Sequence, residues 1–143
     1  MMSTATAAAT PQRKTFALTI ALWAAQVILA VMFGMGGFMK MTAPMDTLVQ
    51  TVPWSADLPV ALVRFIGASE LAGALGLLLP ALTRIKPGLT PLAAAGLATI
   101  MLFAAVFHIA RGEPEALPFN IGLGALALFV AWGRTRRAPI APR

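Results

Sequence analysis

Four long apolar runs, separated by short polar connections, constrain this chain more than any other feature. They cover about residues 15–39, 58–79, 91–110 and 117–132. A helix rises about 1.5 Å per residue, so runs of this kind are suited to crossing a hydrocarbon core about 30 Å thick. Lipid offers no partner to exposed backbone groups, which favours helices. We therefore predict an all-α, polytopic transmembrane four-helix bundle that forms a single domain over residues 15–134.

The composition supports this class and excludes others. Hydrophobic residues make up 59% of the chain and charged residues 11%, with a mean hydropathy of +0.82, which is typical of an integral membrane protein. The net charge of +6 is spread over segment ends instead of forming one patch, so we expect no nucleic-acid partner. The chain has no cysteine, which excludes disulfide and thiol-relay chemistry and therefore the quinone-linked disulfide-forming enzymes.

The distribution of lysine and arginine predicts the orientation of the bundle. Eight basic residues gather on one side of the predicted spans: Arg13, Lys14, Arg84, Lys86, Arg134, Arg136, Arg137 and Arg143. The other side has three: Lys40, Arg64 and Arg111. The positive-inside rule then places both termini in the cytoplasm. We expect residues 1–14 to be a disordered cytoplasmic N-terminus and residues 135–143 a basic cytoplasmic tail.

Two segments admit a further interpretation. The first apolar run follows Arg13 and Lys14 and could be a signal peptide, but its length exceeds a normal signal core and no small-residue cleavage site follows it. We therefore favour a membrane span. The connection after Pro44 has room for a short interfacial helix and offers a contact surface for a partner.

Glu70 is the most informative single residue. It lies near the middle of the second run, and at 100° per residue it shares a face with Gly67, Gly73 and Ala74 while leucines gather opposite. Small residues favour close helix contacts, so Glu70 is predicted to point into the bundle. An ionisable group at this depth costs at least about 2.5 kcal/mol and is by default a functional-site hypothesis. The alternative is a structural bond that holds two helices together.

Four other polar residues are predicted to lie in the same half of the bundle as Glu70. Lys40 ends the first run, Arg64 starts the second, His108 ends the third and Asn120 lies in the first turn of the fourth. Together the five residues form a candidate ligand-binding or polar layer. Each also has a simpler interpretation: Lys40 an interfacial anchor, Arg64 a snorkelling side chain, His108 an interhelical hydrogen bond and Asn120 a helix cap.

Several motifs resemble the DoxX-like family of small four-helix membrane proteins. They are FGMGGFMKM in the first run, RFIGASELAGALGLLLP in the second, GLATIMLFAAVFH in the third and the closing ALFVAWGR. The resemblance implies a multi-pass bundle in a bacterial inner membrane. It also implies contact with other membrane or redox proteins, because the family is named after a subunit of a thiosulfate:quinone oxidoreductase and distant members act as membrane chaperones.

Two functions from different classes follow. In the first, the chain is a non-catalytic subunit, scaffold or assembly factor whose buried polar layer fixes the helix packing. In the alternative, it is a quinone-binding or other lipophilic-ligand-binding subunit of a membrane redox complex, with a quinone as candidate cofactor. Catalysis by the isolated chain is disfavoured and no catalytic residue is assigned, because no cysteine, paired-histidine haem signature or dinucleotide-binding glycine motif is present.

Other roles have less support in the sequence. A single histidine with one mid-membrane glutamate falls short of a metal-ligand set, so we expect no metal. Transport is disfavoured because the chain has one polar layer and no inverted repeat, although a dimer could supply the second half. Homo-oligomer formation is left open, and the lipid bilayer is the expected environment.

Overall fold

The computed structural model describes residues 11–143, and this part of the chain is helical almost throughout. The long helices are α1 (Pro11–Thr42), α3 (Val60–Thr83), α4 (Leu89–Arg111) and α5 (Leu117–Trp132), and α2 is the short helix Met45–Thr51. Short 3₁₀ helices cover Pro53–Asp57 and Pro114–Ala116, and a π-helical turn covers Gly133–Arg137. Residues 11–143 contain no strand, which confirms the predicted all-α fold.

Four helical segments are long and apolar enough to cross a membrane: Gln12–Thr42, Val60–Thr83, Leu89–Arg111 and Pro114–Arg137. Large apolar side chains such as Phe38, Leu102 and Ile109 remain 60% to 63% exposed. Exposed surface of this kind is suited to lipid rather than water. The chain is therefore a multi-pass membrane protein, as the sequence predicted.

The start of the described chain differs from the sequence-based expectation, and its C-terminal tail makes contacts of its own. The predicted disordered terminus falls mostly on residues 1–10, which lie outside the described residues, but residues 11–14 belong to α1. Glutamine, arginine and lysine are good helix formers, so the helix extends beyond its apolar run. The C-terminal tail contacts the α3–α4 connection, since the Arg143 amide donates to the Arg84 carbonyl (3.1 Å) and Arg84 Nε to the Ala141 carbonyl (2.9 Å).

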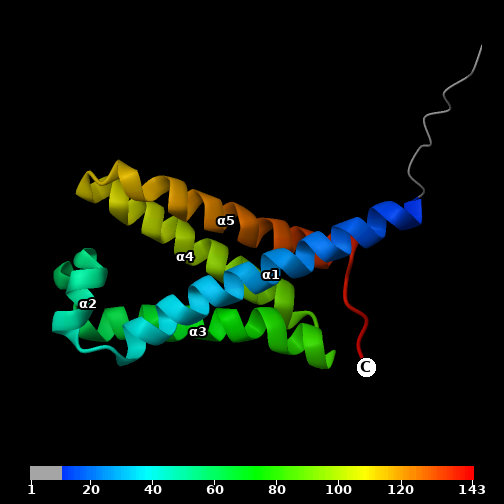
Figure 1. Ribbon diagram of the computed structural model, residues 1–143, viewed down its shortest axis with the longest axis horizontal. Coiled ribbons are helices and arrows are strands. Elements are labelled where there is room, and N and C mark those ends of the chain that lie inside the picture. The colour runs from blue at the N-terminus through cyan, green and yellow to red at the C-terminus, as the bar shows by residue number, and fades with distance from the viewer. Residues whose placement is uncertain (1–10) are drawn as a thin grey trace, which may run out of the picture.

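The bundle consists of two helix pairs. Helix α1 packs most extensively on α3, and α4 on α5. Figure 1 shows that the two pairs approach each other in the middle of the molecule and diverge toward the end at which α2 lies. We call this end the α2 end. The start of α1, the α3–α4 connection and the C-terminus all lie at the opposite end (Figure 1).

The α1–α3 pair is held at very short range by two glycines. A Cβ atom added to Gly37 would lie 2.6 Å from the Gly67 carbonyl oxygen, and one added to Gly67 would lie 2.7 Å from Lys40 Cβ. No real side chain tolerates such distances without a backbone shift. This contact brings the last turns of α1 directly against the first turns of α3, and it fixes where Lys40 meets Glu70.

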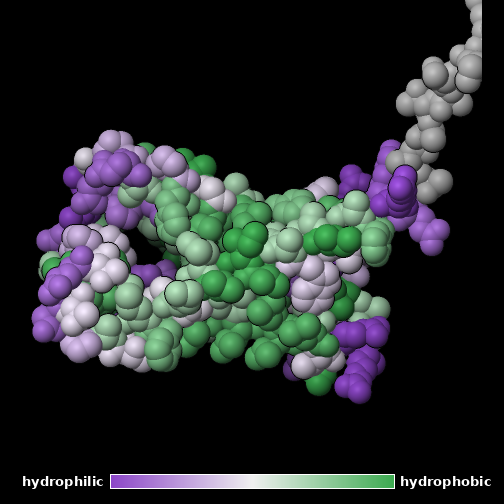
Figure 2. Space-filling view, viewed as in Figure 1, coloured by the Kyte–Doolittle hydropathy of each residue, from purple (hydrophilic) through white to green (hydrophobic). Residues whose placement is uncertain are grey.

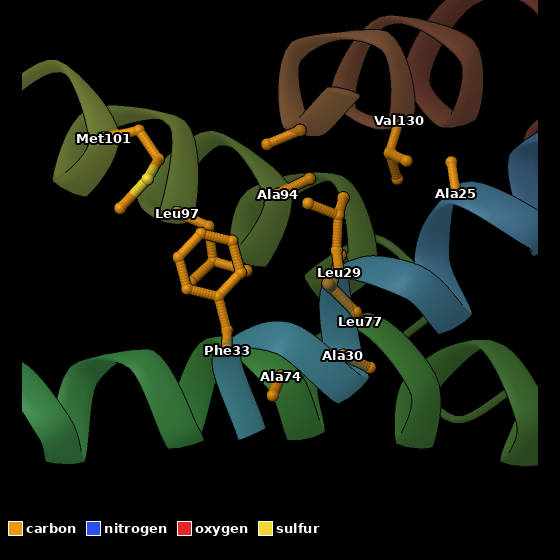
Figure 3. Close-up of a cluster of buried hydrophobic side chains, with 11 residues drawn as sticks. Ala25, Leu29, Ala30, Phe33, Ala74, Leu77, Ala94, Leu97, Met101 and Val130 are labelled. Carbon is orange, nitrogen blue, oxygen red and sulfur yellow. The ribbon is translucent and has the colours of Figure 1, made fainter. Parts of the chain in front are cut away.

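The apolar core lies where the two pairs converge. Buried side chains from α1, α3, α4 and α5 meet there, including Leu29, Phe33, Leu77, Leu97 and Val130 (Figure 3). Met101 lies at the edge of this cluster that faces the α2 end, and it also lines the space beyond. The core therefore closes one side of that space.

Candidate functional site

A cavity of about 930 Å³ lies between the diverging helix pairs at the α2 end. Figure 2 shows the corresponding hollow, with hydrophilic residues on its wall and an apolar band around the middle of the molecule. Most of its lining is apolar, with side chains such as Met32, Phe33, Phe107 and Leu123. Ligand sites in proteins typically occupy about 300 to 1,000 Å³ and combine apolar walls with a few polar groups. This cavity has both properties.

Four of the five predicted layer residues line this cavity: Glu70, Lys40, His108 and Asn120. Arg64 does not. Its guanidinium instead donates to the carbonyls of Lys40 (2.6 Å) and Ala43 (2.7 Å), which are unpaired groups at the end of α1. Arg64 therefore neither snorkels freely nor joins the layer. It caps the helix that carries Lys40.

Lys40 and Glu70 form an ion pair on one wall of the cavity. Lys40 Nζ donates to Glu70 Oε2 over 2.7 Å, and the two side chains are only 12% and 6% exposed. The pair packs beside Gly36, where an added Cβ atom would be in ordinary van der Waals contact with Lys40 Nζ (3.5 Å). The pairing explains how Glu70 is accommodated at this depth, since a buried charge is tolerated when a partner satisfies it.

Trp54 extends from the 3₁₀ helix Pro53–Asp57 over the mouth of the cavity. Its ring lies 5.9 Å from Lys40 Nζ, 6.0 Å from the Phe107 ring and 6.5 Å from the His108 ring, measured to ring centroids. In the structure it packs the segment after α2 against α4 and covers the polar groups.

His108 is oriented by the connection between α4 and α5. Its Nδ1 atom lies 2.7 Å from Glu113 Oε2, and a carboxylate only accepts, so Nδ1 is the donor. Arg111 donates to the same carboxylate from Nε (2.9 Å) and also pairs with Asp57. These donors, Arg111 first and His108 second, lower the pKa of Glu113 below its ordinary value of 4.5. Glu113 is thus a charged anchor that sequence reasoning did not identify.

Asn120 presents an unused hydrogen-bond donor. The residue is 6% exposed, and within residues 11–143 its Nδ2 atom has no partner. It lies in the first turn of α5, across the cavity from the α1–α3 pair. Buried polar groups are normally satisfied, and the exceptions mark positions that a ligand or water completes. The helix-cap interpretation is therefore wrong, because Asn120 lies inside the helix and makes no cap bond.

A second buried polar cluster lies toward the opposite end and was not predicted. Arg134, assigned by the sequence to the basic cytoplasmic side, is only 5% exposed and donates from Nε to Gln26 Oε1 over 2.7 Å. Gln26 in turn donates to the Leu77 carbonyl (2.7 Å), next to the point where Pro80 removes a backbone donor from α3. The partners lie far apart in the sequence, so no local pattern could have found them.

The side chains around the cavity favour binding of an uncharged acceptor. Lys40 and Asn120 supply N–H donors, and the remaining surface is largely apolar. Between residues 11 and 143, no group of three His, Cys, Asp or Glu side chains is placed to hold a metal ion. A lipophilic molecule with a carbonyl group matches the donors and the walls.

Comparison with known proteins gives one finding. A family model described as the DoxX-like family matches residues 24–130, which covers most of the chain and all four spans in whole or in part. No curated protein and no solved structure gives a significant match.

Proposed function

The chain belongs to the DoxX-like family, and from this premise we propose that it is a membrane subunit that binds a lipophilic, carbonyl-bearing molecule in the cavity at the α2 end. A quinone is the candidate cofactor of this class. The chain itself supplies binding and orientation, while any electron donor belongs to a partner protein in the same membrane.

The observation that carries this proposal is the buried, unpartnered amide of Asn120, a residue that lines the cavity of about 930 Å³. A buried donor left unsatisfied costs about 1 to 3 kcal/mol, which an acceptor on a ligand would recover. Lys40 stands on another wall and already donates to Glu70. It carries further N–H groups that a second acceptor on the same molecule could use.

A quinone would supply two-electron redox chemistry when bound, and its two carbonyl groups fit two donors on different walls. The residues of this chain would hold and polarise it: Asn120 and Lys40 by hydrogen bonds, and Glu70 as a nearby carboxylate able to exchange a proton. Trp54 and Phe107 supply aromatic surface over the mouth of the cavity.

A scaffolding or assembly role is the second candidate, and one observation favours it. Glu70 is already paired with Lys40 across α1 and α3, so this bond is satisfied without a ligand. Interhelical polar bonds in membranes contribute about 0.6 to 2 kcal/mol each. In that case the polar layer would specify helix packing, and α2 with its connection would be the contact surface for another membrane protein.

The proposed setting is a bacterial inner membrane with both termini in the cytoplasm, so the cavity lies in the outer half of the bilayer. The single domain would then span residues 15–134, with the Lys- and Arg-rich segments on the cytoplasmic face. This orientation rests on the positive-inside rule.

Equilibrium dialysis of the purified protein in mild detergent tests the proposal, with a tailless dimethoxy-methyl-benzoquinone as probe. Ala104 lines the cavity from α4, and Ala95 lies on the exposed face of the same helix. We expect saturable binding by the wild type and by Ala95→Trp, and clearly weaker binding by Ala104→Trp, in which the indole occupies part of the cavity. Absence of saturable wild-type binding, or equal binding by a folded Ala104→Trp protein, would contradict the proposal.

A further inference from the structure

A second hollow runs along the outside of the bundle between α3 and α4. It has a volume of about 490 Å³ and is lined almost entirely by apolar and small residues, among them Ala72, Gly76, Ala93 and Gly96. We call it the α3–α4 groove. Gly76 and Ala93 bring the helices together at its floor, because a Cβ atom on Gly76 would lie 2.7 Å from Ala93 Cβ. Gly96 leaves open space, with no neighbouring atom within 4 Å of an added Cβ.

The groove adjoins the cavity. Ser69 and Ile100 line both spaces, one from each helix. Ser69 is the polar residue at this junction, and its hydroxyl donates to the Phe65 carbonyl of its own helix (2.9 Å). The hydroxyl is therefore satisfied within α3, and the rest of the groove lining beside this junction is apolar.

Because the two spaces adjoin at Ser69 and Ile100, we infer that the ligand is an amphiphile with one long apolar tail, whose polar head occupies the cavity and whose tail crosses this junction into the α3–α4 groove. This inference rests on the proposed function, since it needs a head group bound beside Lys40 and Asn120. It adds the chemical class of the molecule: a single-tailed lipid such as a prenyl or alkyl quinone, as opposed to a compact ring compound.

The dimensions of the groove favour an alkyl chain over a helix of a partner protein. From Ile100 to Leu89 the groove extends about 16 Å along α4, using the helical rise per residue. A volume of about 490 Å³ over this length leaves a mean cross-section of roughly 30 Å², whereas a helix about 10 Å across needs about 80 Å². The length also equals about half the hydrocarbon thickness, so a tail there would run beside the lipid chains of one leaflet.

Substitutions that fill the groove but not the cavity test the inference. Gly96→Phe fills it from α4 and Ala72→Phe from α3, while Gly122→Phe is the matched control on the exposed face of α5, where an added Cβ would also meet nothing within 4 Å. The probes are two dimethoxy-methyl-benzoquinones, one without a tail and one with a decyl tail. Binding is measured by equilibrium dialysis in one detergent, so that partition of the tailed probe into micelles is the same for every variant.

We expect the wild type and Gly122→Phe to bind both probes. Gly96→Phe and Ala72→Phe should bind the tailless probe normally and the tailed probe roughly tenfold or more weakly, because the tail must then displace a packed ring. Unchanged binding of the tailed probe in both groove variants would overturn the inference and leave the proposed function standing. So would a wild type that binds only the tailless probe, or groove variants that lose both probes equally. A wild type that binds neither probe would overturn the proposed function itself.

Discussion

At the scale of single residues, the pairing of Lys40 with Glu70 is what makes a charged group acceptable inside this bundle. Each side chain is largely buried, and the two charged groups lie 2.7 Å apart. The sequence predicted that Glu70 points inward, because glycine and alanine share its face. It could not predict that Lys40 reaches Glu70, because that depends on the close crossing of α1 and α3.

The stability losses from replacing the two members of this pair should not be additive. Lys40→Met and Glu70→Gln should each lower the free energy of unfolding by about 3 kcal/mol, since each leaves a buried polar partner uncompensated. The double variant should lose clearly less than the sum of the two. Denaturant unfolding in detergent measures this coupling, with Lys86→Met on the exposed α3–α4 connection as the control. Strictly additive losses would show that the two groups do not interact.

Glu113 gives the connection between α4 and α5 a defined pH dependence. Hydrogen bonds from Arg111 and His108 lower the pKa of its carboxyl below 4.5 in the folded protein. A lowered folded pKa contributes stability that is present above the unfolded value and is lost as pH falls through the folded value. The melting temperature should therefore decrease as pH is lowered below about 4.5, and Glu113→Gln should decrease less over the same range. Parallel curves for the two proteins between about pH 6 and pH 3 would contradict this role.

At the scale of helices, the Gly37–Gly67 contact determines how the site is assembled. It brings α1 against α3 so closely that Lys40 lies over the start of α3, where Arg64 caps the last carbonyls of α1. A residue of α3 thus caps the C-terminal end of α1. The spacing of residues along either helix alone does not reveal this arrangement. The sequence therefore predicts that Arg64 is a layer residue or a snorkelling side chain, and it does not predict that Arg64 caps α1.

Gly37→Ala should separate the two helices. Its methyl group would lie 2.6 Å from the Gly67 carbonyl oxygen, so the pair must shift, at a cost of about 1 to 3 kcal/mol. Gly122→Ala, with no neighbour within 4 Å of the new methyl group, should leave the unfolding free energy nearly unchanged. Thermal unfolding of the two variants in the same detergent makes the comparison, and equal stability would contradict the close contact.

At the scale of the whole molecule, the four spans and the inward face of Glu70 follow from local pattern, but the cavity does not. Apolar runs and small-residue faces are properties of neighbouring residues, so they can be read along the chain. The cavity exists because the α1–α3 and α4–α5 pairs diverge at the α2 end, and that divergence is fixed by contacts between distant residues. The bond between Arg134 and Gln26 is likewise a contact between residues distant in the sequence, since it joins the last span to the first.

The predicted orientation is also a property of the whole molecule. Because the natural chain has no cysteine, single-cysteine variants report topology without background. Thr47→Cys on α2 and Ala141→Cys in the C-terminal tail both replace exposed residues. Thr47→Cys should react with a membrane-impermeant maleimide in intact cells, whereas Ala141→Cys should react only after the membrane is permeabilised. The reverse pattern would place the α2 end in the cytoplasm.

Organic extraction and mass spectrometry of molecules that co-purify with the protein tests the central claim most directly, namely that the cavity holds a lipophilic ligand. The wild type and the cavity-filling Ala104→Trp variant are purified side by side in mild detergent, with Ala95→Trp as the control for an added indole. The account predicts a near-stoichiometric, carbonyl-bearing lipophilic species in the wild type and in Ala95→Trp that is clearly reduced in Ala104→Trp. An empty wild type, or the same species at equal level in all three proteins, would contradict it and leave the polar layer as a structural device.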